Sequence, residues 1–141
     1  MGRAALSRRA AWGAMEKNTT ICIVDDDEAV RDSMRILVEA YGYQVQDYPS
    51  ATAFLAEGGP GGADCLVLDL HMPEMDGLEL VGELHRRSVR TPTIMVTGHG
   101  DDNLAQRARK ADVLALLHKP VAAGELIGWI ERAVEQRPAA G

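Results

Sequence analysis

Five short apolar segments, each followed by a stretch with helical periodicity, constrain the fold of this 141-residue chain more than any other feature. The segments begin near residues 20, 43, 64, 92 and 114, so that 21 to 28 residues separate one start from the next. Each interval is long enough for one crossover helix and little else. Repeated right-handed strand–helix–strand units give a parallel sheet with helices on both faces. The sequence therefore predicts an α/β fold: a doubly wound, five-stranded parallel sheet with five helices.

The pattern within each segment indicates where the elements lie. We expect strands over 21–24, 43–48, 65–68, 93–96 and 113–117, and helices over 28–41, 51–57, 77–87, 101–110 and 122–136. Residues 43–48 alternate between apolar and polar side chains, as in a half-exposed edge strand. Asp27 is a typical N-cap for the first helix, and Gly42 is placed to end it. Asp76 with Glu79 forms the pattern of a capping box.

The composition excludes several classes of protein. The chain carries 15 Lys and Arg residues against 21 Asp and Glu residues, a formal net charge of −6, whereas a general nucleic-acid binder usually has a basic excess. No apolar run approaches the roughly 20 residues that span a bilayer. Cys22 and Cys65 lie within apolar runs, which is typical of buried thiols in a reducing compartment and not of a disulfide framework. We therefore expect a cytoplasmic protein with no direct nucleic-acid partner and no membrane insertion.

The two ends of the chain differ from the part between them. Residues 1–18 are rich in Ala and Arg but lack the continuous apolar stretch of a secretory signal, so export is not expected. We interpret this segment as a flexible N-terminal extension. The alternative is a short partner-binding helix around Leu6 and Trp12. The domain itself is expected over 19–137, followed by a C-terminal tail over 138–141.

Polar side chains follow four of the predicted strands at their carboxyl ends. The first strand is followed by Asp25, Asp26 and Asp27, the third by Asp69, the fourth by Thr97 and the fifth by Lys119. Because ligands of doubly wound sheets bind at this edge, we expect these groups to converge. Carboxylates in one cleft raise one another's pKa unless a cation joins them, and their oxygens suit Mg²⁺. A lysine and a threonine hydroxyl would bind a phosphoryl group, and one carboxylate could be the nucleophile that accepts it.

Four segments of the chain together resemble the receiver domain of two-component response regulators. They are 24–31 (VDDDEAVR), 68–77 (LDLHMPEMDG), 96–100 (VTGHG) and 118–120 (HKP), and the likeness covers about residues 19–136. The first and third segments are similar to receivers that usually precede helix-turn-helix output domains. The resemblance implies the strand order 2-1-3-4-5. It also implies that the protein is not a conventional enzyme, and that it catalyses only the Mg²⁺-dependent phosphorylation and dephosphorylation of its own aspartate.

The resemblance assigns a phosphoacceptor and a metal site. It implies that Asp69 accepts the phosphoryl group from a histidine kinase or a histidine phosphotransfer protein. Asp26 and Asp69 would bind Mg²⁺ through their side chains, Asp25 through a water molecule and His71 through its backbone carbonyl.

The resemblance also assigns the groups around the phosphate. Thr97 and Lys119 would contact the phosphoryl oxygens. The bond between Lys119 and Pro120 would be cis, which among peptide bonds is essentially a proline feature. Gly77 would permit a tight turn after Asp69.

One departure from the family concerns the signalling switch. The family usually carries an aromatic residue three places before the lysine, where this chain has Leu116. The phosphorylation chemistry does not need that ring, but the usual switch does. We therefore expect phosphorylation to pull Thr97 and to reorganise residues 97–103, while Leu116 repacks.

Two functions compete at this point. One is a stand-alone receiver that signals through a downstream protein target, or through a homodimer formed on phosphorylation. The other is the receiver part of a DNA-binding transcriptional regulator without its helix-turn-helix output domain. A phosphatase or phosphotransferase is disfavoured, because such enzymes commonly carry a second acid two residues after the nucleophile, where this chain has His71. A flavin-binding protein is excluded, because the loop after the first strand is acidic and not rich in Ser, Thr and Gly.

Overall fold

A five-stranded parallel sheet forms the centre of the structure, a computed structural model that describes residues 18–98 and 103–136. The strands are β1 (Thr20–Val24), β2 (Gln44–Tyr48), β3 (Cys65–Asp69), β4 (Thr93–Thr97) and β5 (Ala115–His118). Their order in the sheet is β2-β1-β3-β4-β5, and every neighbouring pair is parallel. The expected order 2-1-3-4-5 is therefore confirmed. Apart from residue 18, the expected N-terminal extension and C-terminal tail lie outside the described residues.

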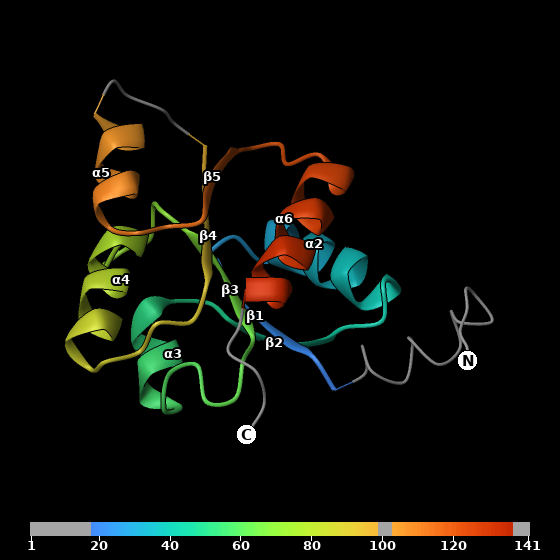
Figure 1. Cartoon of the computed structure of the whole chain (residues 1–141), viewed down its shortest axis with the longest axis horizontal. Coiled ribbons are helices and arrows are strands. Elements are labelled where there is room, and N and C mark those ends of the chain that lie inside the picture. Colours follow the sequence, from blue (N-terminus) through green and yellow to red (C-terminus); the bar gives the residue numbers. More distant parts are fainter. Residues whose placement is uncertain (1–17, 99–102, 137–141) are drawn as a thin grey trace.

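Five helices cover the two faces of the sheet (Figure 1). They are α2 (Glu28–Ala40), α3 (Ala51–Ala56), α4 (Gly77–Arg86), α5 (Leu104–Lys110) and α6 (Ala123–Gln136). Helices α2 and α6 lie on one face, and α3, α4 and α5 lie on the other. This arrangement confirms the doubly wound α/β fold, because successive crossovers place their helices on both sides of one sheet.

Alternate side chains of the strands enter two apolar layers. The layer beneath α2 and α6 contains Ile21, Ile23, Cys65, Val67, Ile94, Val96, Met34, Val38, Leu126 and Ile130. The opposite layer contains Cys22, Val24, Leu66, Leu68, Met95, Phe54, Leu80, Leu84 and Leu104. Both cysteines are free and buried, as expected. Burial raises the pKa of Cys22 to about 12 and also raises that of Cys65, so both thiols are protonated core residues at neutral pH.

Local signals fix the ends of the helices. The Asp27 side chain accepts a hydrogen bond from the backbone N–H of Val30 at 3.1 Å, and Asp76 and Glu79 form a complete capping box. Gly42 has a φ of 96°, a left-handed conformation that suits glycine after a helix end. These expectations are confirmed, and so is the partly exposed character of the edge strand β2.

The fifth strand begins two residues later than the expected range of 113–117. The backbone N–H of Val113 donates to the carbonyl of Ala108 at 3.2 Å, and Asp112 has a φ of 64°. These residues complete the C-terminal turn of α5 in the manner of many helix ends. The register of residues paired with β4 therefore starts at Ala115.

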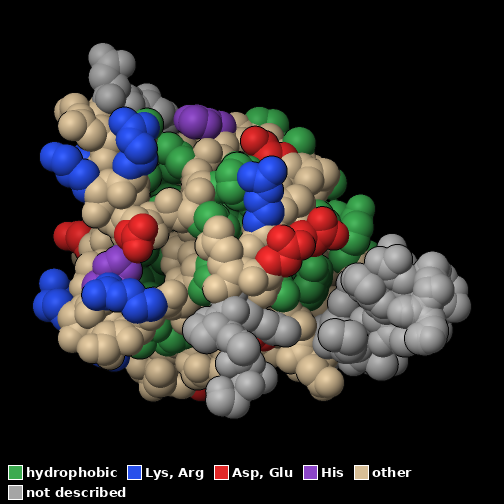
Figure 2. Space-filling view, in the orientation of Figure 1, with side chains coloured by type: hydrophobic (Ala, Val, Ile, Leu, Met, Phe, Trp, Pro, Cys, Tyr) green, Lys and Arg blue, Asp and Glu red, His purple; other side chains and the backbone are tan. Residues whose placement is uncertain are grey.

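Basic side chains gather over α4 and α5 on the face that Figure 2 shows. Arg86 lies in the last turn of α4, and Arg107, Arg109 and Lys110 lie in the last turn of α5. Cations at this end of a helix interact favourably with its dipole. Within the part of the chain that the structure describes, no helix is long and apolar enough to cross a membrane.

Candidate functional site

Three carboxylates meet at the carboxyl edge of the sheet. Strands β1 and β3 are neighbours, with Val24 paired to Leu68, so the residues that end these strands lie side by side. Ligand atoms of Asp25, Asp26 and Asp69 all lie within 4.8 Å of one another. Asp25 and Asp69 are buried, whereas Asp26 is exposed. Three negative charges so close together create a site that favours a cation.

A lysine that follows β5, two strands away from β3 in the sheet, completes this cluster. The Nζ atom of Lys119 lies 3.2 Å from Oδ2 of Asp25 and 3.4 Å from Oδ1 of Asp69. The Lys119–Pro120 peptide bond is cis, as expected. Burial lowers the pKa of Lys119, but the two carboxylates outweigh this effect and the net shift is upward. Lys119 is therefore a cation at neutral pH, available to an anionic group in the pocket.

The pKa of the Asp69 carboxyl group is strongly raised. Burial, and then the charge of Asp25, raise its pKa to about 7, although Lys119 acts in the opposite direction. One lysine therefore does not offset the combined effect of burial and the neighbouring carboxylate. A further cation near Asp69 would favour the ionised form, which is the form that can act as a nucleophile.

Asp25 supplies an independent observation that the pocket fits a metal ion. Its Oδ1 atom accepts a hydrogen bond from the backbone N–H of Asp27 at 2.8 Å. Its Oδ2 atom is buried and accepts no well-directed hydrogen bond from the described residues, and its contact there is the ion pair with Lys119. A buried carboxylate oxygen beside two more carboxylates is the kind of hard donor set that Mg²⁺ prefers.

The remaining expected site residues lie around this centre. Thr97 ends β4 and is buried, and its carbonyl accepts a hydrogen bond from the backbone N–H of Lys119 at 2.8 Å. His71 is exposed, and its backbone N–H points to Oδ1 of Asp69 at 3.4 Å. The loop expected to move, 97–103, lies outside the described residues over 99–102.

Gly77 begins α4 and packs against the end of β3. Its N–H donates to the carbonyl of Leu70 at 2.9 Å. A Cβ atom at this position would lie 2.6 Å from Sδ of Met95 and 2.7 Å from the carbonyl oxygen of Asp69. The left-handed residue of the intervening loop is Glu74, with a φ of 73°. The expected reason for Gly77 is thus corrected: glycine allows close approach to the backbone of Asp69, and the turn conformation does not require it.

Sequence reasoning missed one group that contacts the site. Arg31 donates a hydrogen bond to the backbone carbonyl of Asp25 and forms an ion pair with Asp47 on β2. Arg31 belongs to the segment that carries the family resemblance, but no role was assigned to it. The available signal was the pair of arginines four residues apart, Arg31 and Arg35, together with a lone acid in an alternating edge strand.

The fold and the acidic pocket match those of a known protein family. A family model described as the response regulator receiver domain matches residues 21–131. The chain therefore belongs to this family, and the resemblance is confirmed. Receiver domains of this kind work in two-component systems, are phosphorylated by histidine kinases and bind Mg²⁺ at an acidic pocket.

Individual relatives agree with this assignment. Transcriptional regulatory protein FixJ of Azorhizobium caulinodans is 42% identical over 106 residues, which are 75% of this chain and 50% of that protein. Response regulator protein TmoT of Ectopseudomonas mendocina is 38% identical over 123 residues, which are 87% of this chain and 56% of that protein. The chain thus spans about half the length of the curated relatives it matches.

Solved structures show the same fold. The crystal structure of FixJ-N has a TM-score of 0.79 and 40% sequence identity, covering 87% of this chain and 98% of that chain. A CheY-like receiver domain protein from Methanospirillum hungatei JF-1 has a TM-score of 0.76 and 30% identity, covering 84% of this chain and 94% of that chain.

Proposed function

We propose that this chain accepts a phosphoryl group on Asp69, from a histidine kinase or a histidine phosphotransfer protein, in a Mg²⁺-dependent reaction. The observation that carries the proposal is the position of this carboxylate. Asp69 is buried at the end of β3, 3.4 Å from the ammonium of Lys119 and in one cluster with Asp25 and Asp26. A nucleophile, a cation and further metal ligands thus lie together at the edge where doubly wound sheets bind ligands.

The acidic residues would have two roles, the binding of Mg²⁺ and the nucleophilic attack on phosphorus. The side chains of Asp26 and Asp69, Asp25 through a water molecule, and the backbone carbonyl of His71 would hold Mg²⁺, which when bound neutralises charge on the pocket and on phosphoryl oxygens. A carboxylate oxygen of Asp69 forms the bond to phosphorus as the bond from phosphorus to the donor nitrogen breaks. The chain thus catalyses the phosphorylation of its own aspartate by the donor, and we propose no other substrate.

The remaining groups would bind the transferred phosphoryl group. Lys119 already holds its ammonium at Asp69, so it is placed to pair with an oxygen of the new phosphate. The hydroxyl of Thr97, at the end of the adjacent strand β4, would donate a hydrogen bond to a second oxygen. Both contacts strengthen as negative charge is added to Asp69.

We propose that the phosphorylated domain, over residues 19–137, signals in the cytoplasm by binding a downstream protein or by forming a homodimer. Residues 1–18 would be an extension and 138–141 a tail. A second candidate function is the receiver part of a DNA-binding transcriptional regulator. The relative FixJ, a transcriptional regulatory protein of which this chain matches half, favours it. The reading frame of the gene after codon 141 distinguishes the two functions.

Intact-mass measurement after incubation with acetyl phosphate and Mg²⁺ tests the central proposal. The wild-type protein should gain the mass of one phosphoryl group, and Asp69→Asn should gain none. Asp32→Asn removes the same charge from an exposed position on α2 and should behave as the wild type. An adduct that persists at the wild-type level in Asp69→Asn contradicts the proposal.

A further inference from the structure

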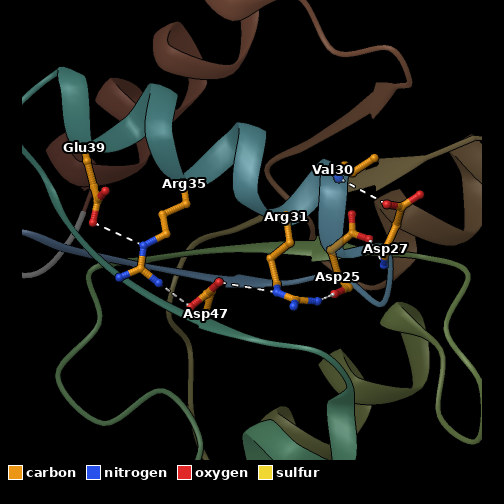
Figure 3. Close-up of polar contacts among 7 residues, drawn as sticks. All are labelled: Asp25, Asp27, Val30, Arg31, Arg35, Glu39 and Asp47. Carbon is orange, nitrogen blue, oxygen red and sulfur yellow. Dashed lines mark hydrogen bonds and ion pairs between the residues drawn. The ribbon is translucent and has the colours of Figure 1, made fainter.

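Arg31 bridges the acidic pocket and the edge strand of the sheet (Figure 3). Its Nη1 atom donates a hydrogen bond to the backbone carbonyl oxygen of Asp25 at 2.7 Å. Its Nε atom lies 3.3 Å from Oδ2 of Asp47 on β2. The side chains of Arg31 and Asp47 are only 15% and 18% exposed. The guanidinium is thus held between two acceptors and partly removed from water, which strengthens both contacts.

The carbonyl that Arg31 binds belongs to the peptide bond between Asp25 and Asp26. Because a peptide bond is planar, fixing its oxygen also fixes the direction in which the chain enters Asp26. The same turn is held from the other side, where the N–H of Asp27 donates to Oδ1 of Asp25. Asp26 is exposed, so packing does not hold its side chain, and the backbone sets the direction in which that side chain leaves the chain.

We propose that Arg31 is a positioning residue for the metal site, which it serves by holding the Asp25–Asp26 peptide in the orientation that directs the Asp26 carboxylate toward Asp69. Asp47 orients Arg31, as outer groups orient the ligands of many metal sites. The proposal rests on the proposed function, since it concerns Mg²⁺ binding by the same carboxylates. Arg31 itself touches neither the metal nor the phosphoryl group.

The chain provides a matched control on the same helix. Arg35 lies one turn further along α2, and its Nη1 atom pairs with Oδ1 of the same Asp47 at 2.6 Å. Its Nε atom pairs with Glu39 at 3.3 Å. Arg35 thus binds these two carboxylates, and Figure 3 shows that it points to Asp47 and not to the pocket. Arg35→Met therefore removes the same charge and the same partner as Arg31→Met, but leaves the Asp25 carbonyl bonded.

Calorimetric titration with Mg²⁺ measures the expected difference. Arg31→Met should raise the Kd for Mg²⁺ about tenfold, the lower end of the effect usual for outer groups of metal sites. Arg35→Met should stay within about twofold of the wild type, because only a charge distant from the metal is lost. Arg31→Lys keeps the charge but loses the planar guanidinium that binds the Asp25 carbonyl and Asp47 at the same time. Its Kd for Mg²⁺ should therefore also rise, by about threefold or more.

A second measurement separates positioning from loss of structure. The rate of phosphorylation by acetyl phosphate, followed against Mg²⁺ concentration, should reach half its maximum at a higher concentration in Arg31→Met, with the maximum itself retained. Unfolding by urea in the presence of EDTA establishes that each variant is folded. If Arg31→Met does not fold, the comparison of Arg31→Lys with the wild type decides.

Two results would overturn the proposal about Arg31. One is an equal rise in Kd for Arg31→Met and Arg35→Met, which would leave charge alone as the cause. The other is a Kd for Arg31→Lys equal to that of the wild type. A wild-type protein that binds Mg²⁺ but takes no phosphoryl group would instead contradict the proposed function, and the comparison of Kd values would still test Arg31.

Discussion

The Nζ atom of Lys119 lies 3.4 Å from Oδ1 of Asp69, so a cation from the loop after β5 reaches the carboxylate that ends β3. The same ammonium also lies 3.2 Å from Asp25 and is shared between two acids. One positive charge against the carboxylates of the pocket leaves an excess of negative charge, and burial together with this excess raises the pKa of Asp69. A cation that binds in this pocket should therefore stabilise the folded protein. Removal of one acid should relieve charge repulsion in the pocket, but it should also weaken the binding of that cation.

The substitution Asp26→Asn should abolish most of the stabilisation that Mg²⁺ confers. A ligand that binds only the folded state adds RT ln(1 + [L]/Kd) to the free energy of unfolding, about 2.7 kcal/mol at one hundred times Kd. Urea unfolding of wild type and variant, with Mg²⁺ and with EDTA, measures the difference. Asp32→Asn, an exposed acid on α2, is the control and should keep the full response. Equal stabilisation of Asp26→Asn and the wild type would count against the metal site.

Without metal, Asp69→Asn should stabilise the protein at high pH and not at low pH. The pKa of Asp69 is about 7 in the folded protein, against an ordinary value of 3.8. The folded state then binds more protons than the unfolded state between these values, so its stability falls as the pH rises through this window. At about 1.4 kcal/mol per pKa unit, the penalty above pH 7 has an upper bound of about 4 kcal/mol. Below pH 3.8 it vanishes.

Unfolding curves in EDTA at a series of pH values test this expectation. The difference in unfolding free energy between Asp69→Asn and the wild type should grow between pH 4 and pH 7 and then level off. A difference that is constant with pH would mean that the charge of Asp69 does not strain the metal-free fold.

Two glycines of α4 should respond in opposite directions to alanine. Gly77→Ala places a Cβ atom 2.7 Å from the carbonyl oxygen of Asp69, a backbone atom that cannot move aside cheaply. We expect a loss of about 1–3 kcal/mol in unfolding free energy, as for other overpacked sites, and a displaced Asp69 that is phosphorylated more slowly. At Gly82 the nearest atom to a new Cβ is Nη1 of Arg86, 3.9 Å away. Gly82→Ala should therefore gain about 0.5–1 kcal/mol, the usual preference of a helix interior for alanine.

Thermal or urea unfolding measures the stability of the two variants, and incubation with acetyl phosphate measures their rates of phosphorylation. Equal effects of the two substitutions on both stability and rate would show that close packing at Gly77 is unimportant.

The features of the fold that depend on local or periodic signals could be predicted from the sequence. The caps at Asp27 and Asp76 are examples, because a cap needs only residues three or four positions apart. The convergence of Asp25, Asp69 and Lys119 was also predictable, because strand ends of a parallel sheet share one edge.

The features that depend on contacts between distant elements could not be predicted in the same way. The requirement for Gly77 arises from Met95 on β4 and from the backbone of β3, neither of which a local pattern reports. The bridge from Arg31 to Asp47 joins a helix to an edge strand that the alternating pattern describes only as half-exposed. Strand β5 begins later than the apolar pattern predicts, because the end of α5 uses the backbone N–H of Val113, a residue that the pattern assigns to the strand.

The last prediction concerns the path by which the phosphorylated site changes the surface. Thr97 is buried at the end of β4, and Leu116 packs partly buried in the same apolar layer as Met95 and Leu104. Helix α5 follows, with seven residues of which only Leu104 and Ala108 are buried. So short a helix with so few buried contacts belongs to the less stable parts of a fold, where a small change in free energy alters the conformation.

We therefore expect a pull on Thr97 to move α5 while Leu116 repacks, since the phosphoryl group needs only to favour one of two arrangements. Backbone NMR with and without a beryllofluoride phosphate mimic checks this. Chemical shifts should change at Asp69, Thr97 and Gly98 and continue through residues 103–110. In Thr97→Ala the changes beside Asp69 should remain, and those in 103–110 should shrink, because the hydroxyl that links the phosphate to β4 is absent. Changes confined to the acidic pocket in the wild type, with 103–110 unmoved, would rule out this path and favour a role in passing the phosphoryl group onward.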